Sequence, residues 1–250
     1  MSQTFPTDPA KPYHSQHGPL IIYAAGGLFT YRELAMNLAL KEAVWRQSAG
    51  KYQLILPQSA QPEGFEHPDV SIQIRNADLW HVMRTDLLLA QFDGLELDAG
   101  TVAEYMMAKF LGKPTVILRS DSRRMKNEGF DEPYNLMLKN YPRTIVLHLD
   151  SLTDYLNRWE MLKPSGGQEL AFDEVIEREK QAIEKGVGEL AARVIQGFEA
   201  VRQMPSPYPP EMAKAVYRAA RLLPGSGYDE LVSAEDLEAL LIRLESHGTL

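Results

Sequence analysis

Cysteine is absent from the sequence of 250 residues. Its absence excludes disulfide bonds, thiolate metal ligands and cysteine nucleophiles, and it fits a reducing compartment. Uncharged apolar runs long enough to span a bilayer are missing as well, and the N-terminal residues lack the apolar core of a signal peptide. Basic side chains are outnumbered, because 26 Lys and Arg face 34 Asp and Glu, for a net charge of −8. This charge disfavours nucleic acids and anionic membranes as partners, and we expect a cytoplasmic protein.

The composition that remains is that of a globular protein. Hydrophobic residues make up 44% of the chain and charged residues 24%, and the length suffices for a sizeable core. Residues 1–18 are an exception, because Pro6, Pro9 and Pro12 interrupt a stretch that has no apolar pattern. We expect this stretch to be a flexible N-terminal arm.

Short apolar runs alternate with helical patterns over residues 19–165. The runs predict strands at Leu20–Ala25, Tyr52–Leu56, Leu87–Ala90, Thr115–Leu118 and Thr144–Leu149. Helices are predicted at residues 30–47, 70–83 and 101–111, the first with an inner face of Leu34, Leu38, Val44 and Trp45. Because every connection is long enough for a crossover, the strands are expected to be parallel and covered on both faces. The pattern predicts one doubly wound α/β domain, flavodoxin-like or Rossmann-like, with a five-stranded parallel sheet.

Residues 166–250 show helical patterns alone and predict a helical C-terminal extension. An amphipathic pattern covers residues 172–201, a second helix is predicted near residues 211–223, and Ser233 begins the last one. The apolar stripe of residues 172–201 would not stay in water on an isolated helix. We therefore expect the extension to pack against the core or against a sister subunit, and the sequence does not choose between the two.

The most informative stretch runs from Asp86 to Pro114. It begins with the apolar run of the third strand, continues in a loop that carries Asp93, Glu96 and Asp98, and ends in a helix. Such a unit places its carboxylates at the carboxyl end of a strand, where open α/β sheets keep their binding sites.

Two interpretations of Glu104 compete. In the first, Thr101 caps the helix and Glu104, three residues later, completes a capping box. In the second, Glu104 is a nucleophile that attacks an anomeric carbon and holds the sugar covalently, and Asp98 is a proton donor or binds the base. Composition and spacing do not choose between them.

A family resemblance favours the second interpretation. The segment Asp98–Glu104, D-A-G-T-V-A-E, resembles the active-site segment D-x-G-x-x-x-E of the nucleoside 2-deoxyribosyltransferases. Tyr23–Thr30, Y-A-A-G-G-L-F-T, resembles the first strand and loop of that family, and Asn76–Asp78 lies where the family has a base-binding aspartate. Asn135–Met137, N-L-M, resembles a segment that a neighbouring subunit supplies to the site. The resemblance covers roughly residues 20–150 and leaves the extension unmatched.

The resemblance implies transfer of 2-deoxyribose between nucleobases by double displacement, through a covalent glycosyl-Glu104 intermediate. It further implies that Tyr23 orients Glu104, that Asp98 protonates the departing base, and that Asp78 helps to hold the base. No metal or organic cofactor is needed for this chemistry. The implied partners are deoxynucleosides and free nucleobases, and the implied assembly is a homo-oligomer, a dimer or larger, with shared active sites.

Further substrate contacts are expected around these groups. Gln58 and Gln61 follow the second strand, and each is either a solvated loop side chain or a hydrogen-bonding partner of a nucleobase edge. The resemblance places Gly26 and Phe29 in the first loop of the site. It also places Asn135 at the sugar 5′-hydroxyl and Met137 nearby, both from a neighbouring subunit.

Three alternatives remain open from the sequence. One is a hydrolase of deoxynucleoside 5′-monophosphates, but that related family tends to have a serine-bearing phosphate site where this chain has Asn135–Met137. Another is a nucleoside hydrolase, in which water outcompetes the acceptor base. The third is a non-catalytic nucleotide-binding module, whose acidic loop only caps a helix.

Overall fold

The computed structural model describes residues 18–60, 67–123, 125–127, 130–163 and 170–250. Residues 1–17 of the predicted N-terminal arm and the candidate Gln61 lie outside the described residues.

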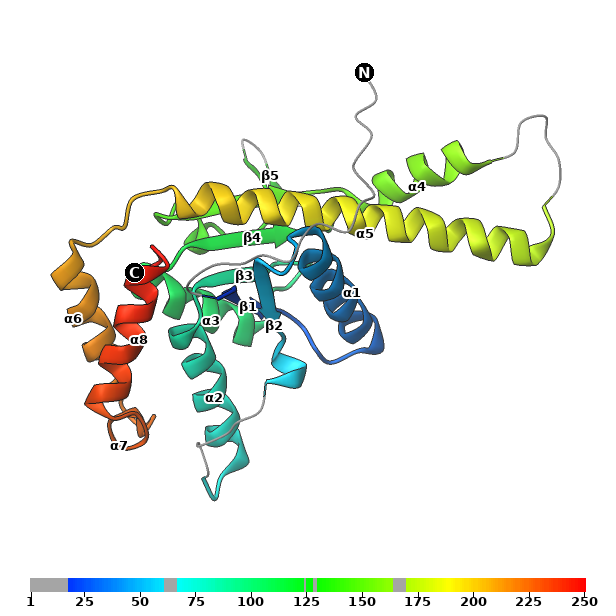
Figure 1. Ribbon diagram of the computed structural model, residues 1–250. Helices are drawn as coiled ribbons and strands as arrows, with labels where there is room; N and C mark the ends of the chain where they lie inside the picture. Colours follow the sequence, from blue (N-terminus) through cyan, green and yellow to red (C-terminus); the bar gives the residue numbers. More distant parts are fainter. Residues whose placement is uncertain (1–17, 61–66, 124, 128–129, 164–169) are drawn as a thin grey trace.

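A parallel sheet forms the centre of the protein (Figure 1). Its strands are β1 (Leu20–Ala25), β2 (Tyr52–Ile55), β3 (Leu87–Gln91), β4 (Thr115–Arg119) and β7 (Thr144–His148). The five strands lie in the order β2-β1-β3-β4-β7, and every neighbouring pair is parallel. This order confirms the predicted doubly wound α/β fold. Because the chain leaves β1 toward β2 on one side and later enters β3 on the other, the switch point lies between β1 and β3.

Helices and short elements connect the strands and follow them. The α-helices are α1 (Tyr31–Gln47), α2 (Val70–Arg84), α3 (Ala99–Phe110), α4 (Ser151–Leu162), α5 (Phe172–Arg202), α6 (Pro210–Ala220), α7 (Tyr228–Leu231) and α8 (Ala234–Ser246). The short elements are the 3₁₀ turns η1 (Pro57–Ser59) and η2 (Leu136–Leu138) and the strands β5 (Met125–Asn127) and β6 (Phe130–Glu132), which form a hairpin. Within the described part of the chain, no helix combines the length and apolarity needed to cross a membrane.

Two helical layers cover the sheet because successive strand side chains alternate between its faces. On one face, Leu89 and Val116 pack with Val44 of α1 and Phe198 of α5. On the other face, Leu88 and Ile117 pack with side chains of α2 and α3, among them Tyr105. The second face is the one that carries the candidate site.

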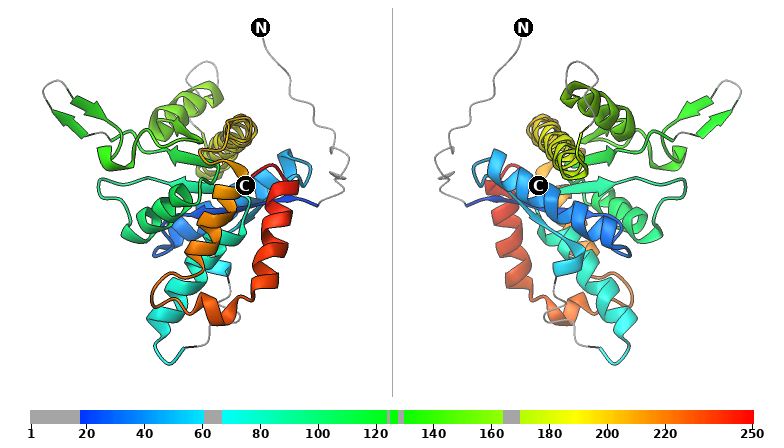
Figure 2. Two further views of the ribbon diagram at one scale, coloured as in Figure 1. Left: turned by 90° about the vertical axis from the view of Figure 1, so that its left-hand side faces the viewer. Right: turned by 90° about the vertical axis from the view of Figure 1, so that its right-hand side faces the viewer.

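The C-terminal extension packs on its own chain. Four buried side chains of α5 join the core above the sheet: Ala191, Val194, Phe198 and Val201. Gly197 permits this approach, because a Cβ atom there would lie 3.2 Å from the Val116 side chain. Farther on, α6, α7 and α8 pack against α2, with Tyr217, Tyr228 and Leu241 in one buried cluster with Ala77 (Figure 2). The other end of α5, together with α4, extends beyond the sheet (Figure 1).

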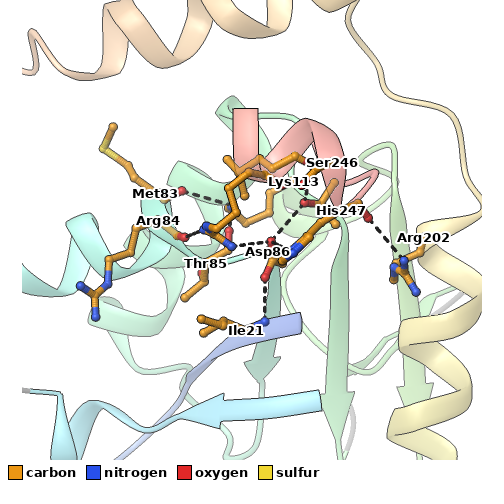
Figure 3. Close-up of polar contacts among 12 residues, drawn as sticks. Ile21, Met83, Arg84, Thr85, Asp86, Lys113, Arg202, Ser246 and His247 are labelled. Atoms are coloured by element: carbon orange, nitrogen blue, oxygen red, sulfur yellow. Dashed lines mark hydrogen bonds and ion pairs between the residues drawn. The ribbon is translucent and has the colours of Figure 1, made fainter. Parts of the chain in front are cut away.

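A buried acid ties the end of α8 to the amino edge of the sheet. Asp86 is fully buried and accepts a hydrogen bond from the Ile21 amide at 2.7 Å (Figure 3). Its other oxygen lies 2.9 Å from both the Arg243 guanidinium and the His247 ring. Nearby, the ammonium of Lys113 donates to the carbonyl of Thr85. The charges of distant segments therefore compensate one another at this edge.

We expect Asp86→Asn to destabilise the fold by about 3 kcal/mol, because it leaves the cation of a largely buried pair without its partner. The matched control is Glu238→Gln. Glu238 also lies on α8 and pairs with Arg218, and the side chains of Arg218 and Glu238 are 48% and 47% exposed. That exposed pair should contribute less than about 1 kcal/mol. Urea unfolding of both variants measures the difference, and equal losses would contradict the assigned role of Asp86.

Candidate active site

A phenol and two carboxyl groups from three separate elements meet on the face of the sheet that α2 and α3 cover. The Tyr23 hydroxyl of β1 donates a hydrogen bond to Glu104 Oε1 of α3 at 2.8 Å. The same hydroxyl lies 3.3 Å from Asp78 Oδ1 of α2. Tyr23 is fully buried and Glu104 is 8% exposed. Because the phenol has one proton, the two carboxyl groups compete for it, and the longer distance to Asp78 indicates that Glu104 receives the stronger bond.

The local structure explains why these groups converge. In β1, Tyr23 points to the face covered by α2 and α3, where it belongs to the same core cluster as Tyr105. His81 follows Asp78 by one helical turn on α2 and stacks on Tyr23, with ring centroids 6.0 Å apart and ring planes 2° apart. The sequence prediction missed His81, although a spacing of three residues from Asp78 places both on one helix face.

Burial dominates the electrostatics of the cluster. It raises the pKa of Glu104 from 4.5 to about 8; the hydrogen bond from Tyr23 lowers it in part, and the charges of Asp78 and Asp98 add to the rise. Burial also raises the pKa of Asp78, against a lowering by the Tyr23 hydrogen bond. The pKa of Tyr23 is raised, first by burial and then by the charge of Glu104. Near neutral pH, a proton is therefore held among these groups.

Asp98 caps α3, and this excludes the first of the two interpretations of Glu104, the capping box with Thr101. The helix begins at Ala99, and Asp98 Oδ2 accepts hydrogen bonds from the backbone amide and the hydroxyl of Thr101, at 2.7 and 2.8 Å. A carboxylate at this position is a better cap than a hydroxyl inside the first turn. Glu104 is consequently free of the helix terminus, and its carboxylate faces Tyr23.

A set of reciprocal contacts holds the loop that leads to Asp98. The Asp93 carboxylate accepts from the amide and the hydroxyl of Ser120, both at 2.6 Å. In return, the Gly94 amide donates to Asp121 Oδ2 at 3.0 Å. The guanidinium of Arg119 is buried and donates to the carbonyls of Phe92 and Gly94. The loop after β3 is thereby tied to the loop after β4.

Two cavities open at this edge of the sheet. One has a volume of about 670 Å³, and its lining includes Gly27, Asn37, Gln91 and Asp98. The other, of about 510 Å³, is lined by residues that include Arg119, Tyr134, Asn135 and Met137. Among the described residues that line either cavity, Glu104 is not present. Asp98, whose charge acts on Glu104, borders the first cavity.

The remaining candidates, Gly26, Phe29 and Gln58, differ in their contacts and exposure. Gly26 follows β1, and a Cβ atom there would lie 2.5 Å from Gln91 Nε2, so a side chain at this position would displace the Gln91 amide. Phe29 is 75% exposed. Gln58 accepts from Asn37 Nδ2 at 3.0 Å and donates to the Leu34 carbonyl at 3.1 Å, so its amide is engaged within the protein.

Asn135 and Met137 belong to a short turn, η2, and its cap. Asn135 caps η2, because its Oδ1 accepts from the Met137 amide at 2.9 Å. Met137 is 76% exposed. Both residues line the cavity of about 510 Å³ rather than the one that Asp98 borders. A single chain therefore brings together Tyr23, Asp78 and Glu104, whereas Asn135 and Met137 line a second cavity, which shares Ala99 with the first.

No three His, Asp or Glu side chains are grouped so as to hold a metal ion in the portion of the chain that the structure describes.

Comparison with protein families gives one match. Residues 22–137 match the family model described as nucleoside 2-deoxyribosyltransferase. All four segments on which the sequence resemblance depends lie inside this range, and the match confirms the resemblance. No curated protein matches the chain.

Among solved structures, the chain is similar to a 2-deoxyribosyltransferase of Bacillus psychrosaccharolyticus, at 21% identity over 50% of this chain and 85% of that one, with a TM-score of 0.37. It is similar to a conserved protein of Enterococcus faecalis V583, at 23% identity over 68% of this chain and 98% of that one, with a TM-score of 0.37. It is also similar to a CMP N-glycosidase of Clostridium botulinum, at 15% identity over 56% of this chain and 98% of that one, again with a TM-score of 0.37.

The contacts of Glu104 predict opposite pKa changes in two variants. Tyr23→Phe removes a hydrogen bond that lowers the pKa of Glu104, so this pKa should rise above about 8. Asp78→Asn removes a negative charge that raises the pKa, so it should fall below about 8. Carboxyl ¹³C NMR titration, with Glu104→Gln to identify the signal, measures both. Shifts in the same direction would contradict the described cluster.

The same raised pKa has a consequence for stability. The unfolded chain loses the Glu104 proton at its ordinary pKa of 4.5 and the folded protein only at about 8. Between these values the folded state binds more protons, so this group lowers the free energy of unfolding as pH rises through the window. The loss should be absent from Glu104→Gln.

Proposed function

Since residues 22–137 carry a domain of the nucleoside 2-deoxyribosyltransferase family, we propose that this protein transfers 2-deoxyribose between nucleobases. The observation that carries the proposal is the buried hydrogen bond of 2.8 Å between Tyr23 and Glu104. It fixes one oxygen of a carboxylate that the helix terminus does not use and leaves the other oxygen for reaction. This arrangement suits a nucleophile that must attack from one direction.

The first half-reaction breaks the N-glycosidic bond. Because burial raises the pKa of Glu104 to about 8, its proton must first move within the cluster, and Asp78 is the acceptor that shares the Tyr23 hydroxyl. An oxygen of the ionised Glu104 then attacks C1′ while the bond from C1′ to the base nitrogen breaks, through an oxocarbenium-like transition state. The electron pair of the broken bond leaves with the base, and the sugar remains as an ester of Glu104. Tyr23 keeps the carboxylate oriented throughout, because its hydroxyl lies closer to Glu104, at 2.8 Å, than to Asp78, at 3.3 Å.

The departing base needs a proton, and two carboxyl groups are near. Asp98 Oδ2 already accepts two hydrogen bonds from Thr101, as the cap of α3. Asp78 has a pKa raised by burial and is the better proton carrier. The contacts therefore support Asp78 as the donor and Asp98 as an acceptor that holds a base N–H, which exchanges the roles that the resemblance implies.

In the second half-reaction, the nitrogen of another base attacks C1′ from the face that the first base left, and its proton passes to the carboxylate of Asp78. The ester bond to Glu104 breaks, the carboxylate is restored, and two inversions return the original anomer. Attack by water in place of the base would give hydrolysis. Glu104 is only 8% exposed, so a base bound next to the sugar ester would keep water away from C1′. This exclusion favours transfer over hydrolysis.

The nucleophile assignment predicts a covalent adduct. Incubation with a 2-fluoro-2-deoxynucleoside should leave the fluorinated sugar on Glu104, detected by mass spectrometry of the digested protein. Glu104→Ala should form no adduct and transfer no sugar between deoxyinosine and free adenine. It should not show the loss of about 1 kcal/mol that removal of a helix cap causes, since Asp98 is the cap.

Three results would contradict this assignment in different ways. An adduct on another residue would replace the nucleophile. Base release from deoxyinosine that does not depend on adenine would assign the protein as a hydrolase. No release with or without adenine, from deoxyinosine and from its 5′-monophosphate, would favour a non-catalytic nucleotide-binding module.

We further propose that the site is shared between subunits of a homo-oligomer. Asn135 and Met137 line a separate cavity in their own chain, and the exposure of Met137, 76%, leaves its side chain available to a neighbour. A second copy that brings these residues to the cavity bordered by Asp98 would complete the site with the sugar-binding groups that one chain lacks.

Subunit mixing tests the shared site. Glu104→Ala and Asn135→Ala should each be inactive alone, and their mixture should regain activity. In a dimer, random exchange makes half of the molecules mixed, and each mixed dimer has one intact site of two, so about a quarter of wild-type activity is expected. Native mass spectrometry verifies exchange. Mixed dimers without activity would assign Asn135 to its own subunit's site.

A further inference from the structure

A chain of side-chain amides crosses the switch point of the sheet. Gln91, at the end of β3, donates from Nε2 to Asn37 Oδ1 at 3.0 Å. Asn37, buried on α1, donates from Nδ2 to the Gly27 carbonyl and to Gln58 Oε1, both at 3.0 Å. Gln58 in turn donates to the carbonyl of Leu34 at 3.1 Å. The chain thus links β3 to the loops that follow β1 and β2.

Backbone carbonyls fix the direction of every amide in this chain. A carbonyl oxygen only accepts hydrogen bonds, so Gln58 must present nitrogen to Leu34, and its oxygen then faces Asn37. Asn37 must likewise present nitrogen to Gly27 and therefore turns its oxygen to Gln91. Reversal of any one amide would bring two acceptors or two donors together. The orientation of Gln91 is consequently set by its neighbours and not by a substrate.

The fixed orientation leaves one edge of Gln91 unused. Its second N–H and its Oε1 have no hydrogen-bond partner among the described residues, while its first N–H is bound to Asn37. Gln91 lines the cavity of about 670 Å³ that Asp98 also borders. Because Gly26 has no side chain, the side-chain amide of Gln91 can lie close to the end of β1. A side chain at position 26 would displace this amide. The cavity is thus given a preoriented donor and acceptor side by side.

We infer that Gln91 is a specificity-determining residue, whose amide edge pairs with an adjacent donor and acceptor on a nucleobase. Adenine offers such a pair in its 6-amino group and the neighbouring ring nitrogen, and glutamine binds adenine in this bidentate way. Unsubstituted purine keeps the ring nitrogen and lacks the donor. The inference rests on the proposed function for the identity of the ligand as a nucleobase.

Preorientation gives the pairing its value. A free glutamine side chain loses rotamer entropy when it binds a ligand, whereas Gln91 is already held by Asn37 in the unliganded protein. The acceptor Oε1 also rejects bases without a donor at the matching position, because it would be left without a hydrogen bond when the ligand covers it. Gln91 therefore favours bases with the matching donor and acceptor through a lower entropy cost of binding, and it disfavours the others because its Oε1 would lose a hydrogen bond.

Binding of free bases tests the inference without any chemistry. Calorimetry of the full-length protein with adenine and with unsubstituted purine gives a ratio of dissociation constants. Wild type should bind purine about tenfold to a hundredfold more weakly than adenine. Gln91→Met removes both polar groups at similar length, and its ratio should fall close to one, mainly through weaker adenine binding. Met36→Leu is the matched control, since Met36 lines the same cavity outside the amide chain.

The outcomes separate this inference from the proposed function. A wild-type ratio near one, or a ratio that Gln91→Met leaves unchanged, would overturn the inference. A ratio lost in Gln91→Met and kept in Met36→Leu supports it, provided that thermal unfolding shows both variants to be folded. If that pattern is found and no sugar transfer occurs, the proposed transferase activity fails while the role of Gln91 in base recognition stands.

Discussion

The hydrogen bond from Tyr23 to Glu104 is the contact on which the candidate site depends. It joins the first strand to the helix after the third strand, and Asp78 brings a further helix to the same hydroxyl. Three acidic groups in one buried space are costly, because ionisation of each would oppose ionisation of the next. The raised pKa values of Glu104 and Asp78 are the physical response to that cost. The fold therefore stores a proton where the proposed reaction requires one.

The topology of the sheet explains why recognition and chemistry can be separate. Strand order reverses beside β1, so the loops after β1 and β3 diverge and leave a cavity between them. Glu104 lies on α3 and does not line this cavity, whereas Gln91 and Asn37 do line it. In the proposed reaction, amides without charge would pair with a neutral base, and carboxyl groups would act on the charge that develops on the sugar and the base.

The sequence predicted the regular elements well and the irregular contacts poorly. The strand positions are confirmed, because periodicity is a local property of the sequence. The inner face of α1 was wrong in part: Leu38 and Trp45 are 58% and 46% exposed, and Asn37 is buried in their place. The burial of Asn37 is explained only by the chain of side-chain amides to which it belongs, and two bonded members of this chain, Asn37 and Gln91, are 54 residues apart in the sequence. Likewise, only family resemblance could group Tyr23 with a glutamate 81 residues later.

The extension belongs to the same physical system as the site, although the family match ends before it. The α6–α7 loop and the first residue of α7 hold α2 by two buried contacts of 2.6 Å. Asn76 Nδ2 donates to the Ser226 carbonyl of the loop, and the Tyr228 hydroxyl of α7 donates to the Asn76 carbonyl. Asp78 follows Asn76 by two residues on that helix. A carboxyl group 3.3 Å from Tyr23 shares the phenolic proton only if the helix that bears it is fixed. The extension thus supports, from the outer side, the position of a group that the proposed reaction uses on the inner side.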